Sequence, residues 1–477
     1  MKKAIYIFIF FISQYFFGQQ SNQLWKGYFS YNEIVDVESS TNAVFASTQN
    51  ALFSQVVASS NLNVYNSITG LKPDVITTIH HSDAFNKTFV GNNNGLILIQ
   101  NADGSVTTKV DVIEEVPVPP NKKKINDFFE FNGRLYIATD YGISVIDIAT
   151  SEFISTYFIG TSGEETEVLQ TTVFNNEIYA VTRSFGIRKA NLNNPNLFDF
   201  SQWQTFDTGF WFGIVTFNNQ LIATNANART YRFNGGTAFE ILNHNQAGLK
   251  LKTNGTELIV TTQNNVYVLN QSFSILAHIT QIPNFTVRFT AASVVGGIIY
   301  IGTEKEGLFS TSLSNPTVFT AMSPNGPLQN STFRLKKATN KIWVVHGDYS
   351  QSFNPYPLDE LGISTFTADQ GWSVIPYSEL NGAKSLSDIA INPSNQNQVY
   401  VTSYFSGLLK MFGNTIELLN NTNTGPNGLE SLVLPGNPAY VDIRINSPAF
   451  DREGNLWVTN SYVNRAIKVL RANGQWQ

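Results

Sequence analysis

One short pattern recurs along the whole chain and constrains its fold more than any other feature. In each copy an apolar strand is centred on a large or branched residue and bounded by polar turn residues, as in "NGRLYIAT" (132–139) and "EGNLWVTN" (453–460). Ten copies align, with centres at Phe45, Phe89, Tyr136, Tyr179, Ile222, Ile259, Tyr300, Trp343, Tyr400 and Trp457. A sustained period of about 40 to 50 residues is typical of repeat architectures, and the strand-forming residues favour a β-propeller over a helical solenoid.

Residues 125–160 indicate how one repeat folds. Asn132 and Gly133 both tolerate positive φ, so they favour a tight hairpin turn that pairs the strand before them with the strand after them. A second turn at Tyr141-Gly142 and two further apolar runs complete four strands. Four antiparallel strands of this length predict one propeller blade, which buries its two faces only against neighbouring blades.

The spacing of the copies predicts two propellers. Successive centres are 37 to 47 residues apart up to Trp343 and 57 residues apart beyond it. Ten blades exceed the roughly 4 to 8 blades of one ring. We therefore expect an all-β chain with a seven-bladed propeller at residues 24–320 and an incomplete second propeller of about three blades at 328–477. Because three blades cannot close a ring, we expect the chain to be a truncated form of a longer one.

The N-terminus "MKKAIYIFIFFISQYFFGQQ" (1–20) places two lysines before an apolar run that is shorter than the roughly 20 residues of a membrane-spanning helix. This layout predicts a signal peptide at residues 1–18 and therefore export. An uncleaved N-terminal anchor is the alternative. No later run is long and apolar enough to predict a transmembrane segment.

Charge and cysteine content exclude several classes of partner and site. The net charge is -5 and the pI is near 5.6, so the chain has no basic excess to attract nucleic acid. Cysteine is absent, which excludes disulfides, thiolate metal sites and a lipid-bearing N-terminal cysteine.

Motifs that carry catalysis are missing from the sequence. The five histidines lack the helical spacing of zinc hydrolases, and neither a nucleophile elbow nor a phosphate-binding loop occurs. His80 and His81 should point to opposite faces of one strand. The pairs Glu114-Glu115 and Glu164-Glu165 lie in polar loops and are interpreted as solvated. We therefore predict a chain that is not an enzyme, with no catalytic residues, no metal site and no cofactor.

Lys122, Lys123 and Lys124 form the one basic cluster of the sequence. Their default interpretation is a solvated loop. The alternative is a contact for an anionic group such as a lipopolysaccharide phosphate.

Several segments in order resemble one known family. The N-terminal propeller of the PorZ family resembles two segments of this chain, 122–168 ("KKKINDFFEFNGRLYIATDYG…") and 175–192 ("NNEIYAVTRSFGIRKANL"). Members of that family are cell-surface components of the type IX secretion system. "LWKGYFSYNEIVDVESS…" (24–54) resembles its first blade, and "KIWVVHGDY" (341–349) and "SPAFDREGNLWVTN" (447–460) resemble the start of its second propeller. That family has two seven-bladed propellers and a β-sandwich domain, so this chain departs from the family pattern at its C-terminal side.

The resemblance implies a non-enzymatic scaffold that is exported to the periplasm or to the outer-membrane cell surface. It implies protein partners in a sortase-containing attachment complex that joins secreted cargo to anionic lipopolysaccharide, and it implies no binding residues. The alternative function is the periplasmic propeller portion of a two-component sensor that binds glycan.

Overall fold

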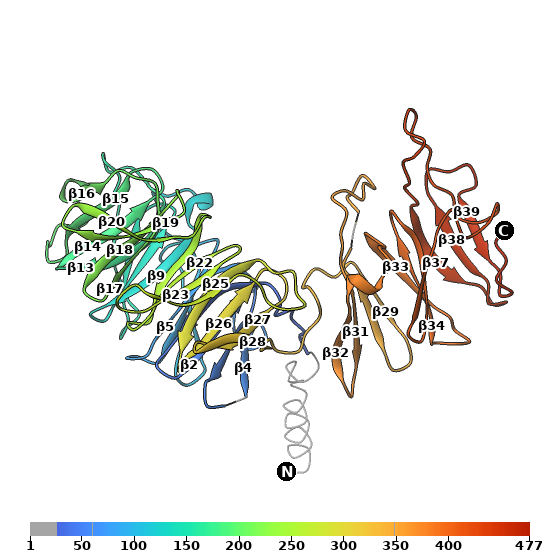
Figure 1. Cartoon of the computed structure of the whole chain (residues 1–477), viewed down its shortest axis with the longest axis horizontal. Helices are drawn as coiled ribbons and strands as arrows, with labels where there is room; N and C mark the ends of the chain where they lie inside the picture. Colours follow the sequence, from blue (N-terminus) through green and yellow to red (C-terminus); the bar gives the residue numbers. More distant parts are fainter. Residues whose placement is uncertain (1–25, 60, 348) are drawn as a thin grey trace, which may run out of the picture.

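Short apolar strands separated by Asn- and Gly-containing turns give the chain its fold. The computed structural model describes residues 26–59, 61–347 and 349–477, so the predicted signal peptide at 1–18 lies outside the described residues. These residues form antiparallel sheets in two bodies, one of strands β1–β28 and one of strands β29–β39 (Figure 1). The prediction of an all-β chain of four-stranded antiparallel sheets is confirmed. The described part also includes the 3-10 helices η3 (Pro120–Lys122), η4 (Phe200–Gln202) and η5 (Tyr377–Glu379).

The predicted hairpin at Asn132-Gly133 shows how each sheet is built. Asn132 and Gly133 have φ values of 50° and 72°, so the turn reverses the chain and pairs Phe131 with Arg134. The neighbouring strands then follow one another in an up-and-down order, β12-β11-β10-β9. The remaining sheets of the first body have the same order.

The strands of the first body occupy equivalent positions in its seven sheets. The innermost strands are β1 (Ile34–Ser39), β5 (Ile76–Ser82), β9 (Ile125–Phe131), β13 (Val168–Phe174), β17 (Trp211–Phe217), β21 (Gly248–Thr253) and β25 (Phe289–Val295). The second strands are β2 (Ala43–Thr48), β6 (Lys87–Asn92), β10 (Arg134–Thr139), β14 (Glu177–Thr182), β18 (Gln220–Asn225), β22 (Leu258–Thr262) and β26 (Ile298–Thr303). The third strands are β3 (Leu52–Val56), β7 (Ile97–Gln100), β11 (Ile143–Asp147), β15 (Gly186–Asn191), β19 (Arg229–Asn234), β23 (Val266–Leu269) and β27 (Leu308–Ser312). The outer strands are β4 (Leu62–Tyr65), β8 (Val106–Lys109), β12 (Phe153–Tyr157), β16 (Gln204–Asp207), β20 (Thr237–Asn243), β24 (Ile275–Ile279) and β28 (Asn315–Ala321).

The innermost strands of the first body close into a ring. Each contacts the innermost strand of the next sheet, and β25 of the last sheet contacts β1 of the first. The core lies between sheets, where residues such as Tyr136, Val173 and Trp203 pack together. We call the space that the seven innermost strands surround the channel.

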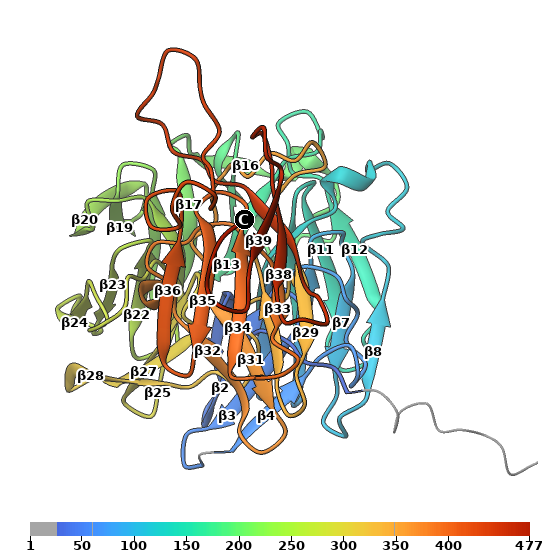
Figure 2. The ribbon, with the colours of Figure 1, turned by 90° about the vertical axis from the view of Figure 1, so that its right-hand side faces the viewer.

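The second body contains three sheets. Its strands are β29 (Arg334–Lys337), β30 (Ile342–Val345), β31 (Ile363–Thr367) and β32 (Gly371–Ile375), then β33 (Leu386–Ile391), β34 (Gln398–Ser403), β35 (Gly407–Phe412) and β36 (Thr415–Leu419), and finally β37 (Ile445–Phe450), β38 (Leu456–Asn460) and β39 (Ile467–Leu470). Contacts of β33 with β29 and β37 set the three sheets side by side. A long loop between β36 and β37 stands out from this body (Figure 2).

The repeated centres of the sequence pattern all lie in the second strand of a sheet. Nine of the ten are at most 9% exposed, as expected of residues packed between sheets. Trp457 differs, because it is 41% exposed on the face of the last sheet opposite to the buried Leu456 and Val458. A turn precedes it, in which Gly454 N–H donates to Asp451 O at 3.2 Å.

The segment before β1 connects the two bodies. Ser30 Oγ and Asn32 Nδ2 both donate to Leu328 O, at 2.8 and 3.1 Å. The Tyr28 ring packs against Trp372 of the second body with 5.5 Å between ring centroids. The segment that leaves the first body after β28 therefore packs against the segment that precedes β1.

Candidate functional site

Charged side chains gather on innermost strands of the first body, where apolar residues would suffice for packing. We name these residues the channel cluster: Asp36 and Glu38 on β1, His80 on β5, Asp127 and Glu130 on β9, and Lys250 and Lys252 on β21. The four strands belong to the first, second, third and sixth sheets, and the closed ring brings them together around the channel.

Asp36 is the fully buried anion of the channel cluster. Its carboxylate lies 2.8 Å from Lys252 Nζ and 3.5 Å from Lys250 Nζ, and it accepts a hydrogen bond of 3.0 Å from Thr78 Oγ1. Burial alone would raise the pKa of Asp36, but the two lysines lower it to about 2. Asp36 therefore stays ionised and joins the first, second and sixth sheets.

His80 connects two carboxylates. Its Nδ1 lies 3.3 Å from Glu38 Oε1, and its Nε2 lies 3.1 Å from Glu130 Oε2. Burial would lower the pKa of His80, but hydrogen bonds to Glu130 and Glu38 raise it to about 9. Both ring nitrogens therefore carry protons at neutral pH, and the imidazolium joins the first, second and third sheets.

Asp127 differs from the other acids of the channel cluster. Within the described residues, no cationic side chain reaches ion-pair distance of its carboxylate. Burial raises its pKa to about 6, an effect that Lys250 and Lys252 oppose and that Asp36 and Glu38 reinforce. Asp127 lines a cavity of about 250 Å³ in the channel.

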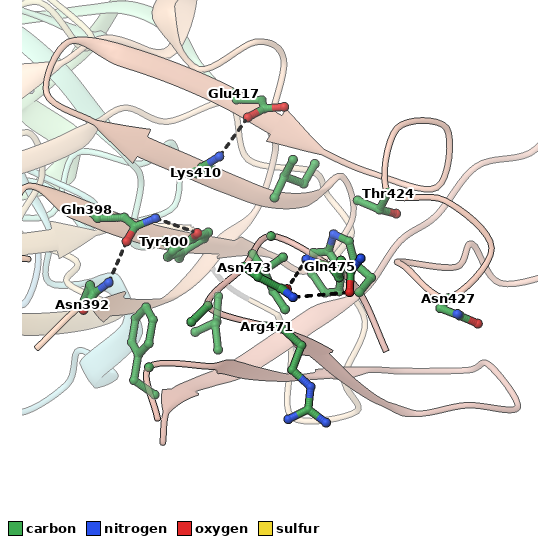
Figure 3. A pocket seen from close by; sticks show the side chains of 18 of the residues that line it. Asn392, Gln398, Tyr400, Lys410, Glu417, Thr424, Asn427, Arg471, Asn473 and Gln475 are labelled. Atoms are coloured by element: carbon green, nitrogen blue, oxygen red, sulfur yellow. Dashed lines mark hydrogen bonds and ion pairs between the residues drawn. The ribbon is translucent and has the colours of Figure 1, made fainter. Parts of the chain in front are cut away.

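A larger hollow lies between the last two sheets (Figure 3). It has a volume of about 1100 Å³, and its lining includes the buried Tyr400, Leu456 and Leu470. Its polar side chains mostly bind one another: Gln398 Nε2 donates to Tyr400 OH at 3.0 Å, and Lys410 lies 3.6 Å from Glu417. The polar groups of this hollow are therefore mostly paired with one another, and they do not point toward a common centre as catalytic residues do.

Aromatic residues collect on loops of the second body. Arg444 is ion-paired with Asp442 at 2.8 Å and lies over the rings of Tyr404 and Tyr462. Tyr462 is 68% exposed. This composition is typical of protein-binding surfaces, in which Tyr and Arg are enriched.

The three consecutive lysines have separate surroundings. Lys122 Nζ lies 2.9 Å from Glu165 Oε2, at an exposed position. Lys123 is buried, and its ammonium donates to the backbone carbonyls of Ile113 and Glu115. Lys124 is half-buried. Contact of Lys122, Lys123 and Lys124 with an anionic group stays a prediction, and the exposed charge of this segment is that of Lys122.

The two adjacent histidines point in different directions, as their place in one strand requires. His80 binds the channel carboxylates, whereas His81 Nδ1 lies 2.9 Å from Thr88 Oγ1 and its ring stacks on Phe45. Across the part of the chain that the structure describes, no three His, Asp or Glu side chains are arranged to hold a metal ion. None of the helices in that part has both the length and the apolar character needed to cross a membrane.

The channel cluster was not identified from the sequence. One feature of the sequence could have indicated it: charged residues occur within otherwise apolar inner strands, as in "IVDVES" (34–39), "INDFFEF" (125–131) and "GLKLKT" (248–253). Such a signal shows that an inner strand carries charge, but not which distant strand supplies the counter-charge.

The fold defines a class: the chain is a β-propeller protein built from repeated four-stranded sheets. Residues 44–204 match the family model described as the N-terminal β-propeller domain of PorZ of the type IX secretion system. The family predicted from the sequence is confirmed by this match, which covers residues 44–204.

One solved structure agrees with this fold over most of the chain. The chain is similar to PorZ of Porphyromonas gingivalis, with a TM-score of 0.80, 17% identity, and coverage of 95% of this chain and 60% of that one. It thus spans less than two thirds of that structure. The extracellular domain of a hybrid two-component system from B. thetaiotaomicron matches with a TM-score of 0.47, 14% identity, and coverage of 94% of this chain and 58% of that one. No curated protein matches the chain.

Proposed function

We propose that this protein is a surface component of a type IX protein secretion system that acts as a scaffold without enzymatic activity. The match of residues 44–204 to the PorZ propeller family carries the proposal. The similarity of the fold over 95% of the chain to PorZ, which is described as an essential bacterial surface component of that system, supports it.

The proposal extends to domains and partners. A signal peptide at 1–18 directs export, a seven-bladed propeller occupies residues 24–320, and the first three blades of a second propeller occupy 328–477. The protein partners belong to a sortase-containing attachment complex at the cell surface or in the periplasm, where cargo is joined to anionic lipopolysaccharide. The exposed Tyr462 and the aromatic loops around it supply a surface of suitable composition for such partners.

Deletion of the gene in its own bacterium tests the proposal. We expect proteins that normally reach the cell surface to accumulate inside the envelope, and a plasmid copy to restore their export. Protease treatment of intact cells separates the two proposed locations, because a surface-exposed protein should be degraded while a periplasmic protein should survive together with a periplasmic marker. Unchanged surface delivery of cargo in the deletion strain would refute the proposed role.

A further inference from the structure

The channel cavity contains one carboxylate that the protein itself leaves without a counter-charge. The cavity of about 250 Å³ is lined by residues of β1, β5, β9, β13, β17 and β21, including Asp127 and Lys252. The other acids of the channel cluster have partners: Asp36 and Glu38 contact Lys252, and Glu130 contacts His80. Asp127 has none among the described residues.

The charges of the channel cluster do not balance. Its four carboxylates face three cationic groups, which are Lys250, Lys252 and the imidazolium of His80. One negative charge is left over when Asp127 is ionised. A buried charge without a partner is costly, so a bound cation of single charge would be favoured here.

A second observation also indicates a ligand at this place. Thr171 lines the cavity and is only 2% exposed, yet its hydroxyl oxygen has no hydrogen-bond partner. Most buried side-chain polar atoms in native proteins have a hydrogen-bond partner, and a ligand with an N–H donor would supply one to this oxygen. Phe129 also lines the cavity, two residues along β9 from Asp127 and therefore on the same side of that strand.

We propose that the channel cavity binds a primary ammonium group of a small organic cation, held by the Asp127 carboxylate, the Thr171 hydroxyl and the ring of Phe129. An ammonium carries one charge and three N–H donors, which matches one carboxylate and one hydroxyl acceptor. An aromatic ring adds a cation–π contact. Amine binding here is independent of the proposed role in secretion.

The residues favour an organic ammonium over a metal ion. Calcium takes six to eight oxygen ligands, several of them carboxylates, whereas Asp127 is the single acid of the channel cluster without a cationic partner. Lys252 in the same cavity wall repels any cation, but it repels a divalent ion about twice as strongly as an ammonium at the same distance. The apolar part of the wall, including Phe129 and Leu251, suits an alkyl chain behind the charged group.

Calorimetric titration of the full chain with n-butylammonium chloride at about pH 7.5 tests the proposal. We expect one saturable site. Three reference ligands separate the contributions: 1-butanol has the shape without the charge, tetramethylammonium has the charge without N–H donors, and sodium chloride matches the ionic strength. All three should bind at least tenfold more weakly than n-butylammonium.

Variants assign the binding to the named residues. Asp127→Asn should weaken n-butylammonium binding at least tenfold, and Thr171→Val should weaken it several-fold. Asp103→Asn, at an exposed turn outside the cavity, should leave binding unchanged. Thermal unfolding of each variant establishes that it is folded.

Binding should also depend on pH through Asp127. The groups around it are Asp36 and Glu38 on β1, His80 on β5, Glu130 on β9, and Lys250 and Lys252 on β21, and among them Asp127 has its pKa raised to about 6. Affinity for n-butylammonium should fall about tenfold between pH 7 and pH 5, as Asp127 becomes protonated. No saturable binding by the folded protein, equal binding of 1-butanol, or unchanged binding by folded Asp127→Asn would each overturn the proposal.

Discussion

Lys252 Nζ lies 2.8 Å from Asp36 Oδ1, an ion pair that links the sixth sheet of the ring to the first across the channel. The seventh sheet closes the same gap by packing, because its strand β25 contacts both β1 and β21. The ring is therefore held at its closure by a buried ion pair as well as by apolar contacts. Burial of Asp36 makes this pair sensitive to the loss of one partner.

Replacement of Lys252 by Met should destabilise the first body strongly. The substitution leaves Asp36 buried beside Lys250 alone, at 3.5 Å, and removes a partner of Glu38. Loss of one member of a buried pair costs about 3–5 kcal/mol. Urea unfolding should show this decrease, and the double variant Asp36→Asn/Lys252→Met should recover part of it. A cost below about 1 kcal/mol for the single variant would contradict the role of the pair.

Stability should fall as the solution becomes alkaline because of His80. Its folded pKa of about 9 lies above the ordinary value of 6.5, so the folded state binds a proton more tightly than the unfolded state does. The stabilisation is complete below about pH 6.5 and is lost as pH rises to about 9. Relative to His80→Gln, the wild-type protein should lose on the order of 2 kcal/mol of unfolding free energy over this range. Equal changes of unfolding free energy with pH in the two proteins would contradict this role of His80.

The contribution of Asp127 to stability should change with pH in the opposite direction to that of a carboxylate in an ion pair. Its folded pKa of about 6 lies above the ordinary value of 3.8, so the folded state favours the protonated acid. Stability from this group is present below about pH 4 and is lost as pH rises through 6. Asp127→Asn should therefore be more stable than the wild type by about 1–2 kcal/mol at pH 8 and nearly equal to it at pH 4. Chemical unfolding at the two pH values measures the difference.

Local features of the fold could be predicted from the sequence because they depend on adjacent residues. The Asn132-Gly133 turn needs positive φ at two positions, and both residues tolerate it, so the β9–β10 hairpin was predictable. The channel cluster could not be predicted in the same way. Lys252 and Asp36 meet only because the ring closes, and no local pattern near either residue indicates the other. Exposure of Trp457 likewise depends on which faces of the last sheet are covered.

Gly186 should tolerate no side chain. It has a φ of +66°, and a Cβ at this position would lie 2.1 Å from the backbone oxygen of Asp207. Because that oxygen belongs to β16 of the same sheet, Gly186→Ala must move a paired strand. We expect a loss of about 2–4 kcal/mol in unfolding free energy. Gly236→Ala is the matched control, since its Cβ would meet no atom within 4 Å, and it should change stability by less than about 0.5 kcal/mol.

Limited trypsin digestion should cut the last sheet before the first ring. The sheet β37–β39 packs against β33 and β34, while Trp457 and Ile467 on it are 41% and 65% exposed. Sheets of a repeat protein take much of their stability from their neighbours, so this sheet should open locally more often than those of the ring. Arg452 and Arg134 provide a matched comparison, because both are exposed and each lies at a hairpin turn. Mass spectrometry should detect cleavage after Arg452 at least tenfold faster than after Arg134. Equal rates at the two sites would mean that the last sheet is as stable as the closed ring.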